Sequence, residues 1–218
     1  MGLTAFPNGV SSFGMPVLPL NGFATQGKAI FVKPSTGSDG VSVKSNSPQR
    51  AFKTLAKALS VADADKNDIV FLIAESNSAS GTTDYQSTAL DWNKDGVHLI
   101  GVNAGSMIGQ RSRIAQTSTV LTIEDLFTVS ADGCMIANIE VFQGVASSSA
   151  TSPRAMVVSG MRNRIINCQI SGDGDTGGSM DTAGARSLAV TGAENTFQHC
   201  YIGLNTVIRA TQTTELYV

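Results

Sequence analysis

Acidic residues are the side chains of this sequence whose type and spacing could support catalysis. A glycosidase needs two carboxylates about 5–10 Å apart that flank the scissile bond. Within the repeated segments described below the acids are few: Asp91, Asp95, Asp132, Glu140 and Glu194. Asp95 and Asp132 occupy the same position of successive segments, but a glycine follows each of them and the next segments lack an acid there. Since Asp-Gly favours turns, we interpret both as turn residues and predict no catalytic residue.

The Gly-Asp-rich segment 172–178, with the sequence GDGDTGG, has the composition of a calcium-binding loop. Counting twelve positions from Asp173, however, gives Gly184 where such a loop carries its bidentate glutamate. A surface loop and a cation site therefore both remain open, and the surface loop is the interpretation we favour. His98 points outward from an expected strand, and neither it nor His199 has metal-ligating neighbours at a suitable spacing. We predict no bound metal and no cofactor.

Three cysteines, Cys134, Cys168 and Cys200, are widely spaced along the chain. An odd number at these spacings fits neither a disulfide framework nor a zinc site. We expect all three to be reduced, buried and apolar in character. Cys168 and Cys200 share one position of the repeat, so we expect them to lie close together as buried thiols rather than as a catalytic pair.

A 15-residue segment recurs four times without a gap, as Leu90–Ala104, Phe127–Val141, Met156–Ile170 and Leu188–Ile202. Positions 1, 3, 10, 13 and 15 are apolar in every copy; position 13 holds Val102, Ile139, Cys168 and Cys200. In a strand, side chains two positions apart point the same way, so positions 1 and 3 share a face, as do positions 8 and 10. Positions 10 and 13 are three apart, so both can face the core only if the chain bends between them. This pattern predicts an all-β, right-handed, single-stranded parallel β-helix. A β-sandwich is the alternative, but antiparallel pairing would not keep the segment gapless four times.

The bend falls at position 12, which defines a structural corner column occupied by Gly101, Asn138, Asn167 and His199. Glycine and asparagine tolerate left-handed backbone conformations, and stacked asparagines can hydrogen-bond along a column. A second polar column stands at position 4. Polar residues at two fixed corners of the repeat, with apolar columns between them, indicate parallel coils stacked on one another.

We divide the chain into an extended arm at 1–27, a strand, loop and capping helix at 28–68, and the parallel β-helix at 69–218. Prolines and glycines exclude a regular helix from the arm. Yet the arm is too apolar for a solvated tail. It packs either along its own domain or, as we favour, onto a partner, through Leu3, Phe6, Val10, Phe13, Met15, Val17, Leu18, Leu20 and Phe23.

One helix is expected in the chain. Ser47 would be its N-cap and Pro48 its first residue, as helix starts favour. An apolar stripe follows at helical spacing: Phe52, Leu55, Ala56, Leu59 and Ala62. The first coil of a solenoid has an open core that must be covered, and this helix would cover it.

The end of the sequence resembles the start of a fifth copy. Leu216-Tyr217-Val218 matches positions 1 to 3 of the repeat, and the sequence stops there. We expect the coil to be unfinished at this point, so that either the natural product continues or a partner covers the end.

Composition excludes several functional classes. The net charge is −2 and there is no basic run, so nucleic acid is not an expected partner. No apolar stretch approaches the roughly 18 residues of a membrane span, and we expect no membrane association. The N-terminus lacks the features of a secretory signal.

The segments Ile30–Val32, Gly37–Gly40 and Ser47–Leu59 together resemble the start of pectate-lyase-like β-helices of tailed bacteriophages. There a short strand is followed by Gly-Ser-Asp-Gly and by a Pro-x-x-Thr-hydrophobic motif; here the sequences are IFV, GSDG and SPQRAFKTLAKAL. The segment Phe6–Val17 also resembles the start of phage proteins that attach to the capsid. The motif resemblance covers about residues 1–60, and over the rest of the chain only the kind of repeat is similar. A fold of this kind serves many functions.

From this resemblance we expect a structural protein of a phage virion, assembled in the host cytoplasm. The arm would attach it to the phage capsid protein, and the β-helix, as a homotrimer, would decorate or cement the shell. Two alternatives stay open. One is a tailspike-like polysaccharide depolymerase, and the other is a receptor-binding fibre without catalysis, each with a host surface glycan as its partner.

Overall fold

The structure is a computed structural model that describes residues 11–12, 15–16, 27–75, 83–103, 111–117, 120, 122–144, 152–172, 185–203 and 216–217. In the arm it describes two short strands, β1 (Ser11–Ser12) and β2 (Met15–Pro16), which pair antiparallel. The apolar side chains assigned to the arm, and most of the Gly-Asp-rich segment, lie outside the described residues.

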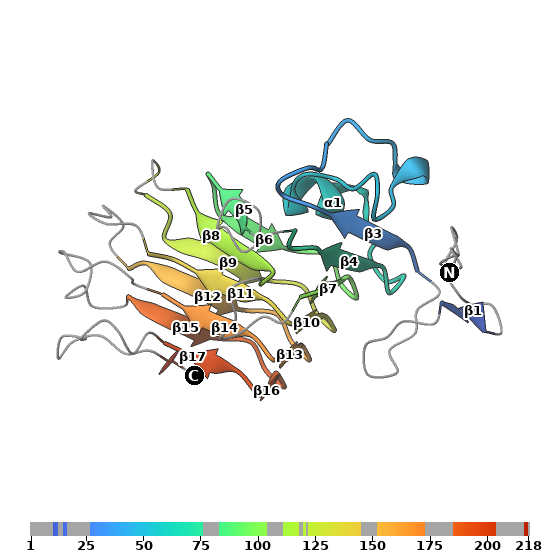
Figure 1. The fold of residues 1–218 in the computed structure, drawn as a ribbon. Helices are drawn as coiled ribbons and strands as arrows, with labels where there is room; N and C mark the ends of the chain where they lie inside the picture. The colour runs from blue at the N-terminus through green and yellow to red at the C-terminus, as the bar shows by residue number, and fades with distance from the viewer. Residues whose placement is uncertain are drawn as a thin grey trace.

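Three parallel sheets form the body of the molecule (Figure 1). The first contains β3 (Ala29–Val32), β4 (Ile69–Leu72), β7 (His98–Gly101), β10 (Met135–Ala137), β13 (Arg164–Ile166) and β16 (Thr196–Gln198). The second contains β5 (Thr83–Gln86), β8 (Arg113–Gln116), β11 (Glu140–Phe142), β14 (Gln169–Ser171) and β17 (Tyr201–Ile202). The third contains β6 (Leu90–Trp92), β9 (Asp125–Val129), β12 (Arg154–Val158), β15 (Arg186–Val190) and β18 (Leu216–Tyr217).

Strand pairing identifies the architecture. From β4 to β15, every strand pairs in parallel with the strand three places later in the chain. The chain therefore visits the third, first and second sheets in turn and returns one level further along the stack. This is a parallel β-helix, and the predicted fold class is confirmed.

The register of the sheets matches the repeat read from the sequence. Position 1 of the four copies aligns across the third sheet as Leu90, Phe127, Met156 and Leu188. Leu216 pairs with Leu188 at the next level, so the fragment of a fifth copy also lies in register. Position 10 aligns in the first sheet as Leu99, Ile136, Ile165 and Phe197.

The first copy departs from the gapless alignment after Gly101, which corrects the sequence prediction. Val141 pairs with Ile114 of β8, whereas the gapless alignment would place Ala104 beside it. More residues separate β7 from β8 than separate the corresponding strands of the later coils. The Val102 N–H donates to the Leu72 carbonyl at 3.0 Å, so Val102 continues the pairing of β7 with β4 where the later copies turn into the second sheet. Val102 is consequently 53% exposed, although position 13 was expected to face the core.

The helix α1 (Leu55–Val61) is shorter than predicted and starts later. Its N-cap is Thr54, whose hydroxyl accepts a hydrogen bond from the Lys57 N–H at 3.1 Å. Residues before it cannot be helical because Phe52 pairs with β3: its N–H donates to the Phe31 carbonyl at 2.9 Å. Ser47 and Arg50 instead close a turn through mutual backbone hydrogen bonds.

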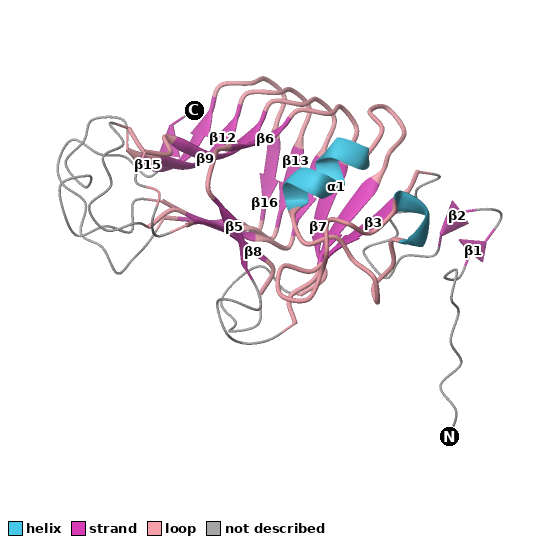
Figure 2. Cartoon of the chain, turned by 90° about the horizontal axis from the view of Figure 1, so that it is seen from above, coloured by secondary structure: helices cyan, strands magenta, loops and turns pink. Residues whose placement is uncertain are grey.

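The buried face of α1 consists of Leu55, Ala58 and Leu59, and Ala56 of the expected stripe is exposed. These side chains join the main core together with Ile30, Val70 and Trp92. The helix lies at the β3–β4 end of the stack (Figure 2), where it covers the interior as predicted for a cap. None of the helices that the structure describes is long and apolar enough to cross a membrane.

Candidate functional site

The turns between the third and first sheets form a ridge along the stack that carries the stacked aspartates. Gly96 and Gly133 both have a φ of 65°, which is the left-handed conformation expected of an Asp-Gly turn. The Asp95 carboxylate accepts the Asp132 N–H at 2.8 Å, and the Asp132 carboxylate accepts the Met161 N–H at 2.7 Å. Each aspartate thus holds the turn of the next coil, and the structure places both in the predicted turn role.

Two adjoining open hollows lie on this ridge and share Asp65 and Asn67. One has a volume of about 390 Å³ and is also lined by Asp95, Gly96, Asp132, Gly133, Met161 and Arg162. The other, of about 470 Å³, is also lined by Gly27, Lys28, Asp63, Lys66 and Asp68. Most of their lining residues are polar or charged, with charges of both signs, so the ridge presents hydrogen-bonding groups across several coils.

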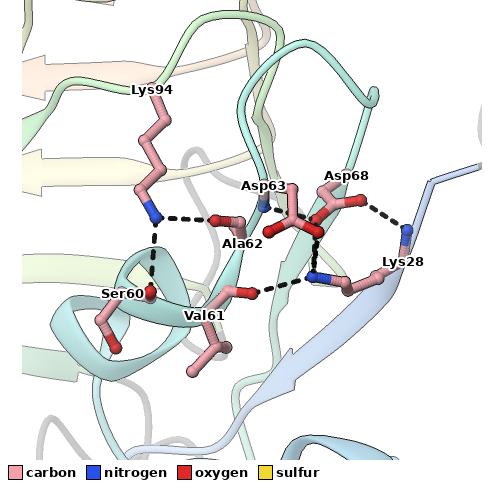
Figure 3. Close-up of polar contacts among 7 residues, drawn as sticks. All are labelled: Lys28, Ser60, Val61, Ala62, Asp63, Asp68 and Lys94. Atoms are coloured by element: carbon pink, nitrogen blue, oxygen red, sulfur yellow. Dashed lines mark hydrogen bonds and ion pairs between the residues drawn. The ribbon is translucent and has the colours of Figure 1, made fainter.

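Lysines from two other segments hold the C-terminal end of α1 (Figure 3). Lys28 Nζ donates to the Val61 carbonyl at 3.0 Å, and Lys94 Nζ donates to the Ala62 carbonyl at 2.7 Å. Cations at this end also interact favourably with the helix dipole. Lys28 Nζ pairs in addition with Asp63 at 2.6 Å. These charges therefore attach the helix to the first coils.

Carboxylates hold the other end of the helix. Asp39, from the Gly-Ser-Asp-Gly motif, accepts the N–H groups of Lys53 and Thr54 at 2.8 and 3.1 Å. Asp84, which faces inward from β5, accepts the Leu55 N–H at 3.0 Å and the Gln86 side-chain amide at 2.8 Å. Both acids satisfy donors that a helix start leaves unpaired. The sequence motif is thus explained by helix capping rather than by chemistry.

Asp84 and His98 are the buried groups with the clearest shifts in pKa. Burial raises the pKa of Asp84 to about 6. Burial lowers the pKa of His98 to about 4. His98 Nδ1 accepts the Met135 N–H at 3.0 Å, and Nε2 lies 3.3 Å from the Asn67 side-chain oxygen, so the neutral ring serves as a tie between strands.

We predict opposing effects of these two groups on stability between about pH 4 and about pH 6.5. Because the folded pKa of Asp84 is raised, its stabilising contribution is present at low pH and lost as the pH rises through about 6. The folded pKa of His98 is lowered, so its contribution is present at neutral pH and lost on acidification towards about 4. Each contribution is at most about 3 kcal/mol, at about 1.4 kcal/mol per pKa unit.

Urea unfolding at about pH 4 and about pH 6.5 would separate the contributions of Asp84 and His98 to stability. Asp84→Asn should lose stability on acidification more steeply than the unchanged protein, and His98→Gln should lose less or gain. Groups common to all three proteins cancel in the comparison. Identical pH profiles for the three proteins would contradict the assignment.

Glu140 forms a buried charged cluster on the outer face of the second sheet. Its Oε2 lies 2.6 Å from Arg111 Nε and 3.0 Å from Arg113 Nε. The Arg113 guanidinium also stacks over the Phe142 ring at 4.5 Å. Burial raises the pKa of Glu140 although both arginines oppose this shift. The carboxylate is enclosed by its partners and is not open to a substrate.

The corner column lies between the first and second sheets. Asn138, Asn167 and His199 have φ values of 57°, 50° and 53°, and the Asn167 side-chain amide donates to the Asn138 side-chain oxygen at 2.9 Å. Gly101 is not in the left-handed region. A Cβ at Gly101 would lie 2.0 Å from the Asn138 carbonyl oxygen, so close backbone approach explains the glycine there.

A second pair of stacked asparagines was missed by the sequence analysis. Asn163 is buried; its side chain accepts the Cys134 N–H at 2.7 Å and donates to the Ala131 carbonyl at 2.9 Å. Asn195, one coil later, makes the same pair of bonds with the Asn163 N–H and the Gly160 carbonyl at 2.8 and 2.9 Å. Both occupy position 8 of the repeat, and that shared position was the available signal.

Comparison with known proteins supports the fold and leaves the activity open. No protein-family model matches the sequence, and no curated protein matches it. Among solved structures, a rhamnogalacturonan lyase is similar over 80% of this chain and 51% of its own, with a TM-score of 0.55 and 18% identity. A pectin methylesterase from Aspergillus niger in deglycosylated form covers 86% of this chain and 62% of its own, with a TM-score of 0.47 and 16% identity.

The chain thus spans about half the length of the lyase that it resembles. At this identity the likeness shows a shared parallel β-helix, in agreement with the pectate-lyase-like fold expected from the sequence. Within the described residues, no three metal-binding side chains are grouped closely enough to hold an ion.

Proposed function

We propose that this chain is a non-catalytic structural protein of a tailed-phage virion, attached to the capsid through residues 1–27. The observation that supports the absence of catalysis is the use made of its carboxylates. In the described part of the chain, every acidic side chain except that of Asp65 accepts a hydrogen bond or forms an ion pair. A glycosidase needs two carboxylates free to approach a glycosidic bond. Here they connect coils, turns and helix ends instead.

The attachment is supported by the composition of the arm. Nine apolar side chains in a segment rich in proline and glycine cannot build a core of their own, but they could be buried against another protein. The β-helix would then project from the shell as a rigid body, as a homotrimer.

Deletion of residues 1–27 tests this proposal. The truncated protein should lose binding to tail-less heads of the phage that encodes it, measured by co-sedimentation, because the apolar contacts are removed. It should keep the far-UV circular dichroism and melting temperature of the β-helix. A matched full-length control with Asn8→Ser and Asn21→Ser should bind normally. Full binding by the truncated protein would contradict the proposed role of the arm. Sedimentation equilibrium would show whether three copies associate.

Polysaccharide binding is a second candidate, favoured by the two adjoining hollows along the ridge, whose lining residues are mostly polar or charged. A chain of sugars offers repeated hydroxyl groups, which stacked polar turns could meet at successive coils. Isothermal titration with purified capsular and O-antigen polysaccharides of the host would test it. Binding would support a receptor-binding or depolymerase role, whose products would appear as new reducing or unsaturated ends. An absence of heat with every polysaccharide would exclude this candidate.

A further inference from the structure

Cys168 and Cys200 lie opposite each other on neighbouring coils. Gln169 pairs in register with Tyr201, and the Tyr201 N–H donates to the Cys168 carbonyl at 2.9 Å. The two cysteines directly precede these residues and occupy position 13 of successive copies. Paired strands lie about 4.8 Å apart, and Cα atoms joined by a disulfide are usually about 4.4–6.8 Å apart. The backbone therefore already brings the two residues to a distance that a disulfide spans.

The thiols of Cys168 and Cys200 differ in burial and in pKa. Cys168 is fully buried, and burial raises the pKa of its thiol. Cys200 is half-buried at the last level of the core, and its hydrogen bond with the Cys168 thiol lowers its pKa. The thiolate is the attacking form in disulfide exchange, so Cys200 is the accessible nucleophile and Cys168 the second thiol.

We propose that Cys168 and Cys200 are a modification site, at which oxidation forms an intrachain disulfide joining the last coil to the one before it. With glutathione disulfide as the oxidant, the Cys200 thiolate attacks one of its sulfurs and releases one glutathione thiolate. The Cys168 sulfur, losing its proton to solvent, then displaces the second glutathione from Cys200. The protein loses two protons and two electrons, which is the mass of two hydrogen atoms, and glutathione disulfide becomes two molecules of glutathione.

The disulfide would stabilise the fold mainly through the unfolded state. It closes a loop of roughly 30 residues in the unfolded chain and so lowers the conformational entropy of that chain. In the folded protein it would join two coils whose strands β14 and β17 already pair in parallel beside the cysteines.

Thiol counting and peptide mapping test the proposal on the full chain. After incubation with glutathione disulfide, the protein should lose the mass of two hydrogens, retain one alkylatable cysteine, and yield a Cys168–Cys200 cross-linked peptide. Cys134→Ser is the matched control. Cys134 is buried, without a cysteine neighbour, and burial raises its pKa to about 12, so its replacement should leave the cross-link intact. Oxidation should raise the melting temperature of this control by roughly 5 °C or more.

Cys168→Ala and Cys200→Ala should each abolish both the cross-link and the oxidation-dependent shift in melting temperature. Circular dichroism of the reduced variants would establish that they fold. The proposal is overturned if oxidised Cys134→Ser retains two alkylatable thiols, if Cys200 stops at a mixed disulfide with glutathione, or if the cross-link joins two chains.

Discussion

Replacing Trp92 by alanine is expected to lower the free energy of unfolding by about 4 kcal/mol. Trp92 is fully buried, and its ring and that of Phe127 meet edge to face, with their centroids 6.3 Å apart. Its indole N–H donates to the Val97 carbonyl at 2.8 Å, so the side chain joins β6 to the turn that follows it. Removing it leaves a cavity at the centre of the stack and one carbonyl without this donor. Urea unfolding should be followed by circular dichroism, because Trp92 is the sole tryptophan.

Val102→Ala is the control for this prediction. Val102 was expected in the core from its place in the repeat, but it is 53% exposed. Its truncation should therefore change the free energy of unfolding by no more than about 0.5 kcal/mol. Trp92→Phe should fall between the two variants, since it keeps most of the volume and loses the hydrogen bond. A large effect of Val102→Ala would mean that this side chain packs in the core, as its position in the repeat suggested.

Glu140→Ala is expected to cost about 3 kcal/mol of stability. Glu140 is buried between Arg111 and Arg113, whose side chains are 27% and 17% exposed. Its removal leaves two partly desolvated guanidinium groups close together without the carboxylate that offsets their repulsion. Glu140→Gln, which keeps the shape and one acceptor oxygen, should be less damaging. Thermal and urea unfolding would measure how far each variant lowers the free energy of unfolding of the unchanged protein.

The Arg162–Glu194 pair provides the comparison for Glu140. Its Nε–Oε2 distance is 2.6 Å, the same as that of Arg111 and Glu140, but both side chains are exposed. Solvent and salt screen such a pair, so Glu194→Gln should leave stability unchanged within error. If Glu140→Ala and Glu194→Gln lowered the free energy of unfolding equally, burial would not explain the contribution of the Glu140 cluster to stability.

The repeat made the coil architecture predictable because stacking imposes the same requirement at each level. A residue at position 1, such as Phe127, must face the core and pair with position 1 of the next coil, so its column stays apolar. The prediction failed where one coil was free to differ. Val102 continues the pairing of β7 with β4 and its side chain is exposed, whereas Ile139 is buried. Nothing in the local sequence pattern distinguishes these two residues.

The candidate site was less predictable than the fold, because the roles of its charges depend on residues distant in sequence. Asp84 precedes no recognisable motif, yet it caps α1 from a strand 29 residues away. Asp39 belongs to the Gly-Ser-Asp-Gly motif, but its contact with Thr54 at the start of α1 is visible only in the folded structure. His98 was correctly expected to point outward from its strand, while its burial depends on neighbours beyond that strand.

The sequence by itself determined the parallel β-helix, the register of its coils and the apolar columns of its core, because these follow from side-chain period and repetition. Tertiary structure alone decided where α1 begins, since Phe52 pairs with β3 and cannot be helical. It also decided what the acids do. Whether a carboxylate can act on a substrate depends on which donors surround it, and the donors to Asp84, Asp132 and Glu140 come from other coils or other turns. These carboxylates therefore connect neighbouring parts of the stack and do not face a substrate.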